Sequence, residues 1–310
     1  MTRASTALEL PAMLQRRLEA AACTLVYAGT ASARDFAEPA REPALVAPDS
    51  VSWQVFKNPL SLFIGGVAAV ILELAEPRVR TGVWEHTSFR KAPLPRLQRT
   101  GLAAMMTVYG PRSRTEAMIA GVNRLHARIA GTTPEGEAYR ADHQELLDWV
   151  HATASFGFLE AWSAYAHPLG EAERDRYYAE GRASAQLYGA HGAPASQREL
   201  EALFAAMRGK LAPSPIVFEF LGIMQGAAIL PPPLNLIQGW LVKAAVDIVP
   251  VWVRERLGLD AQWTLHPWQR RQIRQSGAWA DRILLRSAPA VQACRRLGLP
   301  DDYLYTQGRA

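Results

Sequence analysis

A succession of helical patterns, beginning near Ser50 and continuing to the C-terminus, constrains this chain more than any other feature. Apolar residues recur at spacings of three and four, and no run of alternating β-branched residues is long enough to indicate a sheet. Internal repeats are absent. The sequence therefore predicts an all-α protein, with an N-terminal extension and connector over residues 1–47 and one helical domain over residues 48–310.

Proline and glycine predict where several of these helices end. An apolar helix over residues 60–74 contains Gly65 and Gly66, which favour close contact with another helix. It should end before Pro77, because a residue that precedes proline is pushed away from the α region. The last long helix is expected over residues 280–297.

Two capping-box patterns predict the starts of the helices that carry the most informative histidines. Ser113–Glu116 precedes the helix with His126, and Asp142–Glu145 precedes the helix with His151. The first of these helices is expected to continue to Gly131. Apolar residues three, four and seven positions from His126, and four and seven positions from His151, place both imidazoles on or beside an inward face.

The charge pattern argues against a nucleic-acid partner. The net charge is +5, yet the basic residues are scattered among acids and alanines, without a basic run or basic residues interleaved with aromatic ones. Cys23 and Cys294 lie far apart, so neither a disulfide framework nor a zinc site is indicated.

Membrane-spanning and secretory segments are not predicted either. Residues 1–22 carry charges throughout and lack an apolar core of the signal-peptide kind, which makes the cytoplasm the default location. The apolar run over residues 60–72 is cut by Glu73 and is too short to cross a bilayer. Peripheral contact with a membrane stays open.

Arg96, Thr100 and His126 form the candidate site. The first two stand four residues apart, so on a helix they share one face and can converge on one anionic or hydrogen-bonding ligand. A single inward histidine is more often a core residue than a metal ligand. A second one, His151, on the following helix makes proximal ligation of a haem an equal alternative. Fingerprints of nucleotide binding, zinc proteolysis and serine hydrolysis are absent.

Three motifs in order resemble the MpaB-type oxygenase family, which includes the latex-clearing proteins (rubber oxygenases). They are Gly-Val-Trp-Glu-His-Thr-Ser-Phe with Arg-Leu-Gln-Arg-Thr within residues 79–100, the run 123–131 around His126, and Trp-Val-His-Ala-Thr at residues 149–153. The similarity extends over roughly residues 50–300. It implies an all-helical, globin-like core around haem b, used with dioxygen on a hydrophobic, unsaturated, isoprenoid-like substrate.

Residue by residue, the resemblance makes His126 the proximal iron ligand and Arg96 and Thr100 the pair that supports the haem site. Arg99, between them, belongs to the same catalytic group. His86 and His151 are further candidates for cofactor binding. Local hydrogen bonding is the alternative for His86, and structural support is the alternative for His151.

Two departures from the family pattern limit what can be transferred. Latex-clearing proteins have a lysine where this chain has Arg99, and a guanidinium has no lone pair for a metal, so distal ligation of that kind should be absent. Many relatives have Ala-His-Pro where this chain has Ala75-Glu76-Pro77. Any role of that histidine is lost here.

Two other hypotheses compete with a haem-dependent oxygenase. The first is a non-catalytic helical protein that keeps the family scaffold and binds a lipid or terpenoid. The second is a different metal held by His126 and His151 together with Glu145 or Asp148. The sequence does not identify the substrate, the oligomeric state or the distal ligand.

Overall fold

The structure is a computed structural model that describes residues 5–8, 10–26, 34–226, 230 and 234–306. Residues 1–4, 9 and 27–33 of the predicted N-terminal extension lie outside the described part. The described chain is all-α apart from one two-stranded antiparallel hairpin, so the predicted fold class is confirmed. Its elements are α1 (Ala12–Val26), α2 (Arg34–Ala37), α3 (Val51–Val55), α4 (Pro59–Ala75), α5 (Pro77–His86), α6 (Pro93–Tyr109), α7 (Arg112–His126), β1 (Ala130–Thr132), β2 (Ala138–Arg140), α8 (Gln144–Tyr165), α9 (Glu171–Leu187), α10 (Gln197–Met207), α11 (Pro215–Gly226), η1 (Leu234–Ile237), α12 (Gln238–Ile248), α13 (Val251–Leu257), η2 (Ala261–Trp263), α14 (Pro267–Ala280), α15 (Pro289–Arg296) and α16 (Tyr303–Thr306).

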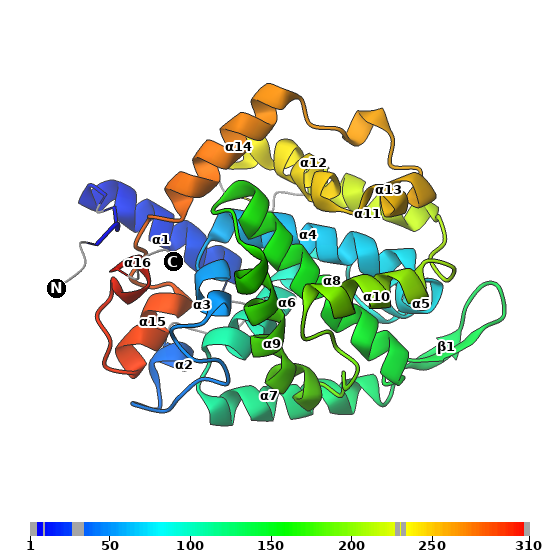
Figure 1. Cartoon of the computed structure of the whole chain (residues 1–310), viewed down its shortest axis with the longest axis horizontal. Helices are drawn as coiled ribbons and strands as arrows, with labels where there is room; N and C mark the ends of the chain where they lie inside the picture. The colour runs from blue at the N-terminus through cyan, green and yellow to red at the C-terminus, as the bar shows by residue number, and fades with distance from the viewer. Residues whose placement is uncertain (1–4, 9, 27–33, 227–229, 231–233, 307–310) are drawn as a thin grey trace.

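The central feature is the crossing of α4 and α8 in the middle of the molecule (Figure 1). The two helices touch backbone to backbone: a Cβ atom on Gly157 would lie 2.4 Å from the carbonyl oxygen of Gly65, and one on Gly65 would lie 2.7 Å from that of Gly157. Only glycine fits at either position, because such distances are well inside van der Waals contact. The close contact predicted for Gly65 is therefore confirmed.

Other helices enclose this pair. α12 and α14 pack against α4 and α8 on one side, and α7 lies along the opposite edge of the molecule (Figure 1). The core is continuous and includes Trp53, Tyr109 and Trp149, each fully buried. A single core of this kind holds the central helices at fixed positions, so side chains on their facing surfaces keep a defined geometry.

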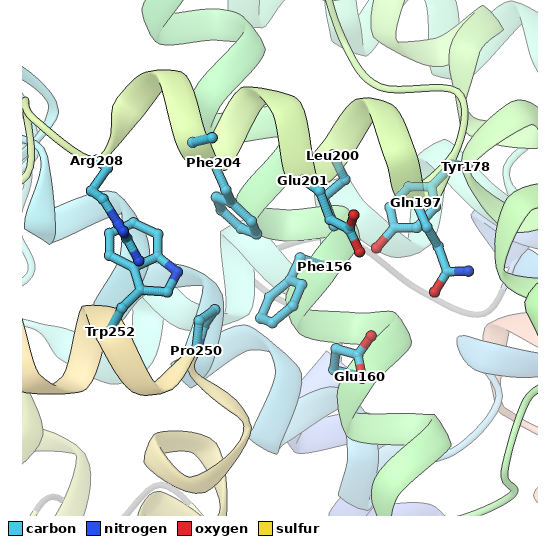
Figure 2. A pocket seen from close by; sticks show the side chains of 11 residues that line it. Phe156, Glu160, Tyr178, Gln197, Leu200, Glu201, Phe204, Arg208, Pro250 and Trp252 are labelled. Atoms are coloured by element: carbon cyan, nitrogen blue, oxygen red, sulfur yellow. The ribbon is translucent and has the colours of Figure 1, made fainter.

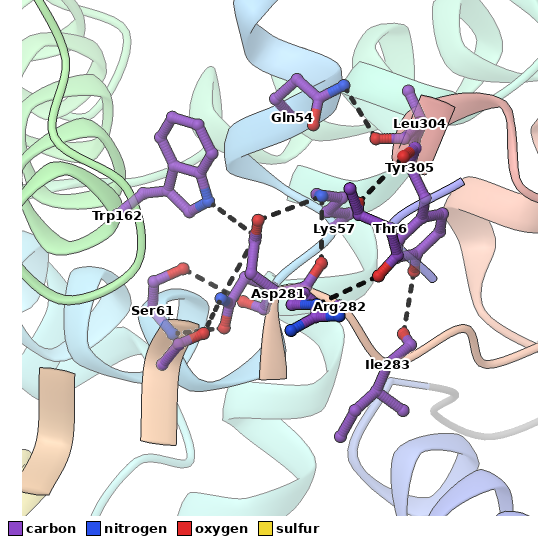
Figure 3. Close-up of polar contacts among 12 residues, drawn as sticks. Thr6, Gln54, Lys57, Ser61, Trp162, Asp281, Arg282, Ile283, Leu304 and Tyr305 are labelled. Atoms are coloured by element: carbon purple, nitrogen blue, oxygen red, sulfur yellow. Dashed lines mark hydrogen bonds and ion pairs between the residues drawn. The ribbon is translucent and has the colours of Figure 1, made fainter. Parts of the chain in front are cut away.

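Asp281, directly after α14, joins that helix to three other elements through a buried polar network (Figure 3). Its Oδ1 accepts hydrogen bonds from Trp162 Nε1 at 3.0 Å and Asn58 Nδ2 at 3.3 Å, and its Oδ2 lies 3.1 Å from Lys57 Nζ. Lys57 also lies over the ring of Tyr305, 4.7 Å from its centroid. Because each buried charge has a partner, the network fixes the junction of α3, α4, α8 and α14 without leaving an unpaired ion.

Arg296 ties the N-terminal connector to the helical domain. Its buried guanidinium donates hydrogen bonds to the backbone carbonyls of Phe36, Glu42 and Tyr109. Trp53 donates from Nε1 to the Val46 carbonyl at 3.0 Å. The described part of the connector is thus held on the domain by side chains that donate to its backbone carbonyls.

Several predicted helix ends differ from the structure. α7 begins at Arg112 without a side-chain cap, and Ser113 instead bonds to Glu42 of the connector. α8 begins at Gln144, and Asp142 pairs with Arg140. Both predicted capping boxes are wrong. The side chain expected to cap each helix forms another contact instead, Ser113 with the distant Glu42 and Asp142 with the nearby Arg140.

The ends of two other predicted helices are also wrong. α7 stops at His126 rather than continuing to Gly131, because Gly131 pairs with Tyr139 in the β1–β2 hairpin. A long helix over 280–297 does not form. Residues 281–288 connect α14 to the shorter α15 and include the Asp281 network.

Candidate functional site

A cavity of about 480 Å³ beside the α4–α8 crossing brings the predicted residues together. Its volume falls in the usual range for small-molecule and cofactor sites, roughly 300–1,000 Å³. Most of its lining is apolar, with side chains from α4, α6, α8 and the segment before α15. Examples are Phe63, Val70, Leu97, Leu147, Val150, Phe158 and Leu285.

Four of the predicted site residues line this cavity. Arg96 and Thr100 extend from α6, His126 is the last residue of α7, and His151 lies in α8. They come from three consecutive helices. The structure thus brings together the residues that the helical-face argument and the family resemblance selected.

His126 is half-buried, and its Nδ1 is buried without a hydrogen-bond partner in the described part of the chain. Burial lowers its pKa, the nearby Arg96 cation lowers it further, and Asp142 opposes the change. The imidazole is therefore neutral at neutral pH. A neutral imidazole keeps a nitrogen lone pair for a metal.

His151 lies inside the same cavity and is also half-buried. Its Nδ1 is buried and has no hydrogen-bond partner among the described residues. Burial lowers its pKa to about 4. His151 is therefore a second neutral imidazole on the cavity wall.

Glu73 of α4 is a cavity residue that the sequence did not single out as functional. Burial raises the pKa of its carboxyl to about 7, and the positive charge of Arg96 opposes that rise. Among the described residues, no side chain is within ion-pair distance of Glu73. Its signal in the sequence was the single carboxylate within the apolar run of residues 60–75.

Arg96 is half-buried, and burial lowers the pKa of its guanidinium, while Glu73 opposes this effect. Its side chain makes no hydrogen bond or ion pair with the part of the chain that the structure describes. Arg96 lines the cavity, so a planar cation with five N–H donors is available there to a ligand. Such a group binds a carboxylate through two parallel hydrogen bonds.

The other predicted residues are arranged differently. Thr100 lines the cavity, and its hydroxyl donates to the Arg96 carbonyl at 3.0 Å. Arg99 is exposed, is not part of the cavity lining, and donates to Ser88 Oγ at 3.2 Å. His86 is exposed at the end of α5 and also lies outside the cavity lining.

A multidentate metal site is not formed by the residues that the sequence suggested for it. Glu145 pairs with Arg78 and Lys210, and Asp148 accepts hydrogen bonds from Gln144 and the Gly192 amide. Within the described ranges, no group of three histidine, cysteine or acidic side chains is placed to hold a metal ion.

A second recess, of about 630 Å³, lies between α8, α10 and α13 (Figure 2). The rings of Phe156 and Phe204 lie edge to face between its two ends, with centroids 5.3 Å apart, and the Arg208 guanidinium lies 4.8 Å from the Trp252 ring centroid at one end. Glu160, which pairs with Arg174, lies toward the other end. None of the predicted site residues line this recess.

Comparison with known protein families identifies the family of this chain. A family model described as "ER-bound oxygenase mpaB/B'/Rubber oxygenase, catalytic domain" matches residues 53–283. The chain belongs to this family. The match includes every cavity residue named in α4, α6, α7 and α8, and it confirms the resemblance seen in the three motifs.

Searches of curated proteins and of solved structures found no match to the chain. The assignment to the family therefore rests on the family model, which describes an oxygenase catalytic domain. In the described part of the chain, no single helix is both long enough and apolar enough to cross a membrane.

Proposed function

We propose that this MpaB/rubber-oxygenase family member is a haem-b-dependent oxygenase that uses dioxygen on a hydrophobic substrate. The observation that carries the proposal is the convergence of a neutral, unpartnered His126 imidazole and an unpartnered Arg96 guanidinium on one mainly apolar cavity. The family's oxygenase description supports the reaction class.

The residues present fit the attachment of a haem. His126 would bind the iron through a ring nitrogen, and Arg96 would pair with a propionate, because a guanidinium and a carboxylate form parallel charge-assisted hydrogen bonds. Thr100, one turn from Arg96, adds a hydroxyl oxygen with free acceptor capacity. When bound, a haem would supply an iron centre that activates dioxygen.

Glu73 and His151 would serve the chemistry beside the haem. The Glu73 pKa of about 7 allows its carboxyl to hold or release a proton near neutral pH, which is the property of a general acid or base. His151, with a pKa of about 4, stays neutral and can accept a hydrogen bond. Both face the cavity from the central helix pair.

The apolar lining supports a hydrophobic substrate. Side chains such as Phe63, Val70 and Phe158 offer no hydrogen bonds, so a polar substrate would lose its hydration without compensation. The family description names a rubber oxygenase, which supports an unsaturated, isoprenoid-like compound. The same lining would exclude water from the reacting centre.

Haem reconstitution of the purified protein tests the proposal. We expect a Soret band that His126→Ala abolishes, and partial recovery of the band in His126→Gly when free imidazole is added. His151→Ala tests the other cavity histidine, and His86→Ala, an exposed residue outside the cavity, is the matched control; both should retain the band. A wild-type protein without a Soret band, or an unchanged band in His126→Ala, would contradict the proposal.

The apolar cavity also supports a second candidate, a haem-free protein that binds a lipid or terpenoid. It predicts that an isoprenoid alcohol such as farnesol binds haem-free protein, and that binding is unaffected by His126→Ala. The oxygenase proposal predicts instead that product forms only with haem and dioxygen present. Titration of the haem-free wild type and of His126→Ala with farnesol tests the binding function. Product formation by the haem-loaded wild type under dioxygen tests the oxygenase.

A further inference from the structure

α14 presents two tryptophans to solvent on the same side. Trp268 and Trp279 are 55% and 47% exposed. They are 11 residues apart, which brings them within about 20° of each other around the helix and about 16 Å apart along it. Between them, Arg271, Gln272 and Gln275 are exposed, and α14 contains no acidic residue. Scattered apolar side chains are ordinary on a surface, but two aligned tryptophans separated by a cation and amides are not.

The surface continues past the N-terminal end of α14. Trp240 of α12 packs edge-on against Trp268, with ring centroids 5.0 Å apart. Leu236, one turn before Trp240, is 78% exposed, the highest value among the large apolar side chains of the described chain. This end of α14 is therefore a small apolar cluster rather than a single exposed ring.

At the C-terminal end of α14, the surface continues onto α1. Arg282 donates to the Thr6 carbonyl, and Gln15 of α1 donates to the Leu284 carbonyl at 2.7 Å. α1 exposes Met13 and Leu14 at 66% and 42%. In Figure 1 the C-terminal end of α14 lies near α1, and the two hydrogen bonds join the N-terminal segment and α1 to residues 282 and 284, just after α14. We call the exposed residues of this edge the α14–α1 face. They are Met13, Leu14, Arg16, Arg17, Leu236, Trp268, Arg271, Gln272, Gln275, Trp279, Arg282 and Arg286.

The charges of the α14–α1 face are positive. It has five exposed arginines. Of the four described carboxylates beside it, two form ion pairs and two accept only from uncharged donors, so five arginines against two uncompensated carboxylates leave the face positive. Glu19 accepts hydrogen bonds from Gln15 and from the Arg286 amide. Asp247 pairs with Arg270, and the buried Asp281 pairs with Lys57. Asp260, before η2, caps the Gln262 amide. The face thus attracts an anionic partner.

We propose that the α14–α1 face docks on the surface of an anionic lipid bilayer. Tryptophan is favoured at the membrane–water interface, where its ring is apolar and its N–H group remains hydrated. Arginine beside it is attracted to anionic headgroups. A folded protein partner would favour the apolar residues gathered in one patch, whereas here they alternate with arginine and glutamine along a helix that lies flat on the surface.

The docking surface is directly connected to the cavity. Leu285 and residues 287–290 line the cavity, and α1 holds the same segment through the Leu284 carbonyl and the Arg286 amide. Docking would therefore place a cavity-lining segment beside the membrane, which is a reservoir for hydrophobic compounds. This last step rests on the proposed function, whereas docking itself does not.

Vesicle sedimentation of the full-length protein tests the proposal. We expect the protein to pellet with phosphatidylcholine vesicles that contain phosphatidylglycerol, to pellet much less with phosphatidylcholine alone, and to be released by high salt. Trp268→Ala with Trp279→Ala should weaken partitioning by roughly tenfold or more. Arg16→Gln, Arg17→Gln and Arg271→Gln should each weaken it by roughly fivefold, because one basic residue near an anionic surface is worth about that factor.

The opposite edge of the molecule supplies a matched control. α7 exposes Leu125 at 60%, flanked by exposed Arg124 and Arg128. Leu125→Ala with Arg124→Gln and Arg128→Gln should leave vesicle binding unchanged. Circular dichroism confirms that each variant is folded. Soret absorbance recorded on the same samples keeps a failure of haem binding separate from a failure of docking.

Three outcomes would overturn the proposal. One is that wild-type protein stays in the supernatant with anionic vesicles at low salt. A second is that the tryptophan and arginine variants pellet like the wild type, or that the α7 control loses binding equally. The third is binding of a soluble polyanion such as heparin without any binding of vesicles, which would assign the face to a nucleic acid or another anionic polymer.

Discussion

Replacing Glu73 by glutamine should stabilise the haem-free protein at high pH and not at low pH. The pKa of the carboxyl rises from 4.5 to about 7 in the folded state because it is buried in the cavity. The folded protein thus binds this proton more tightly than the unfolded chain does. Stability is therefore lost as pH rises from about 4.5 to 7, since the unfolded chain ionises first.

The expected size follows from that difference in pKa. One pKa unit corresponds to about 1.4 kcal/mol, so a rise from 4.5 to about 7 corresponds to about 3 kcal/mol. Glutamine has nearly the same shape and no charge. The free energy of unfolding of Glu73→Gln should therefore equal that of the wild type near pH 4.5 and exceed it by about 3 kcal/mol at pH 8.

Urea unfolding of both haem-free proteins between pH 4.5 and 8.5 measures the difference. Glu116→Gln, at an exposed position of α7, is the matched control and should keep the wild-type pH dependence. Parallel stability curves for Glu73→Gln and the wild type would refute the reasoning. So would a variant that is less stable at pH 8, because Arg96 would then stabilise the carboxylate by more than burial costs.

Three further predictions concern packing, haem affinity and the buried ion pair. Gly157→Ala should destabilise the protein by about 3 kcal/mol and lower its melting temperature by about 5 °C, because the new Cβ would lie 2.4 Å from a backbone oxygen of α4. Gly222→Ala, with open space around its Cβ in α11, should be neutral or slightly stabilising by calorimetry. In haem titrations, Arg96→Ala should weaken binding about 10- to 100-fold, whereas Arg99→Ala, outside the cavity, should change it little. Lys57→Met should cost about 3–5 kcal/mol in urea unfolding, because it removes the lysine counter-ion of the buried Asp281 carboxylate.

Local patterns in the sequence were sufficient to predict those parts of the fold that depend on residues close together in the chain. The helix α4 and its glycine contact followed from an apolar run that contains Gly65 and ends before proline. The meeting of Arg96, Thr100 and His126 followed from their helical faces together with the family resemblance. Such features depend on neighbours within one or two turns, so the sequence displays them directly.

Features that depend on distant residues were missed. Ser113 has the sequence of a cap, yet Glu42, 71 residues earlier, takes its hydroxyl. The hairpin that ends α7 rests on Gly131, whose Cβ would lie 2.6 Å from the Tyr139 hydroxyl. Strands of three residues carry too little periodicity to be recognised. In each case a tertiary contact decides between local alternatives of similar energy.

The two departures from the family pattern have different structural meanings. Glu76 is buried, accepts from the Val79 amide at 2.8 Å as the cap of α5, and pairs with Arg78. It therefore stabilises a helix start, and a neutral histidine there could not supply the same charge to Arg78. Arg99 lies outside the cavity lining, bonded to Ser88.

Arg99 is consequently not the residue that most alters the interior chemistry. A lysine at this position would extend from the same exposed side of α6, so Arg99→Lys alone would not place an amine in the cavity. Besides its two neutral histidines, the cavity contains Glu73, whose charge changes near neutral pH and which lies on the central helix within the electrostatic influence of Arg96. We infer that the interior chemistry of this chain is set by the pair Glu73 and Arg96. Arg99, the departure from the family pattern, lies about one turn of α6 from Arg96 but outside the cavity lining.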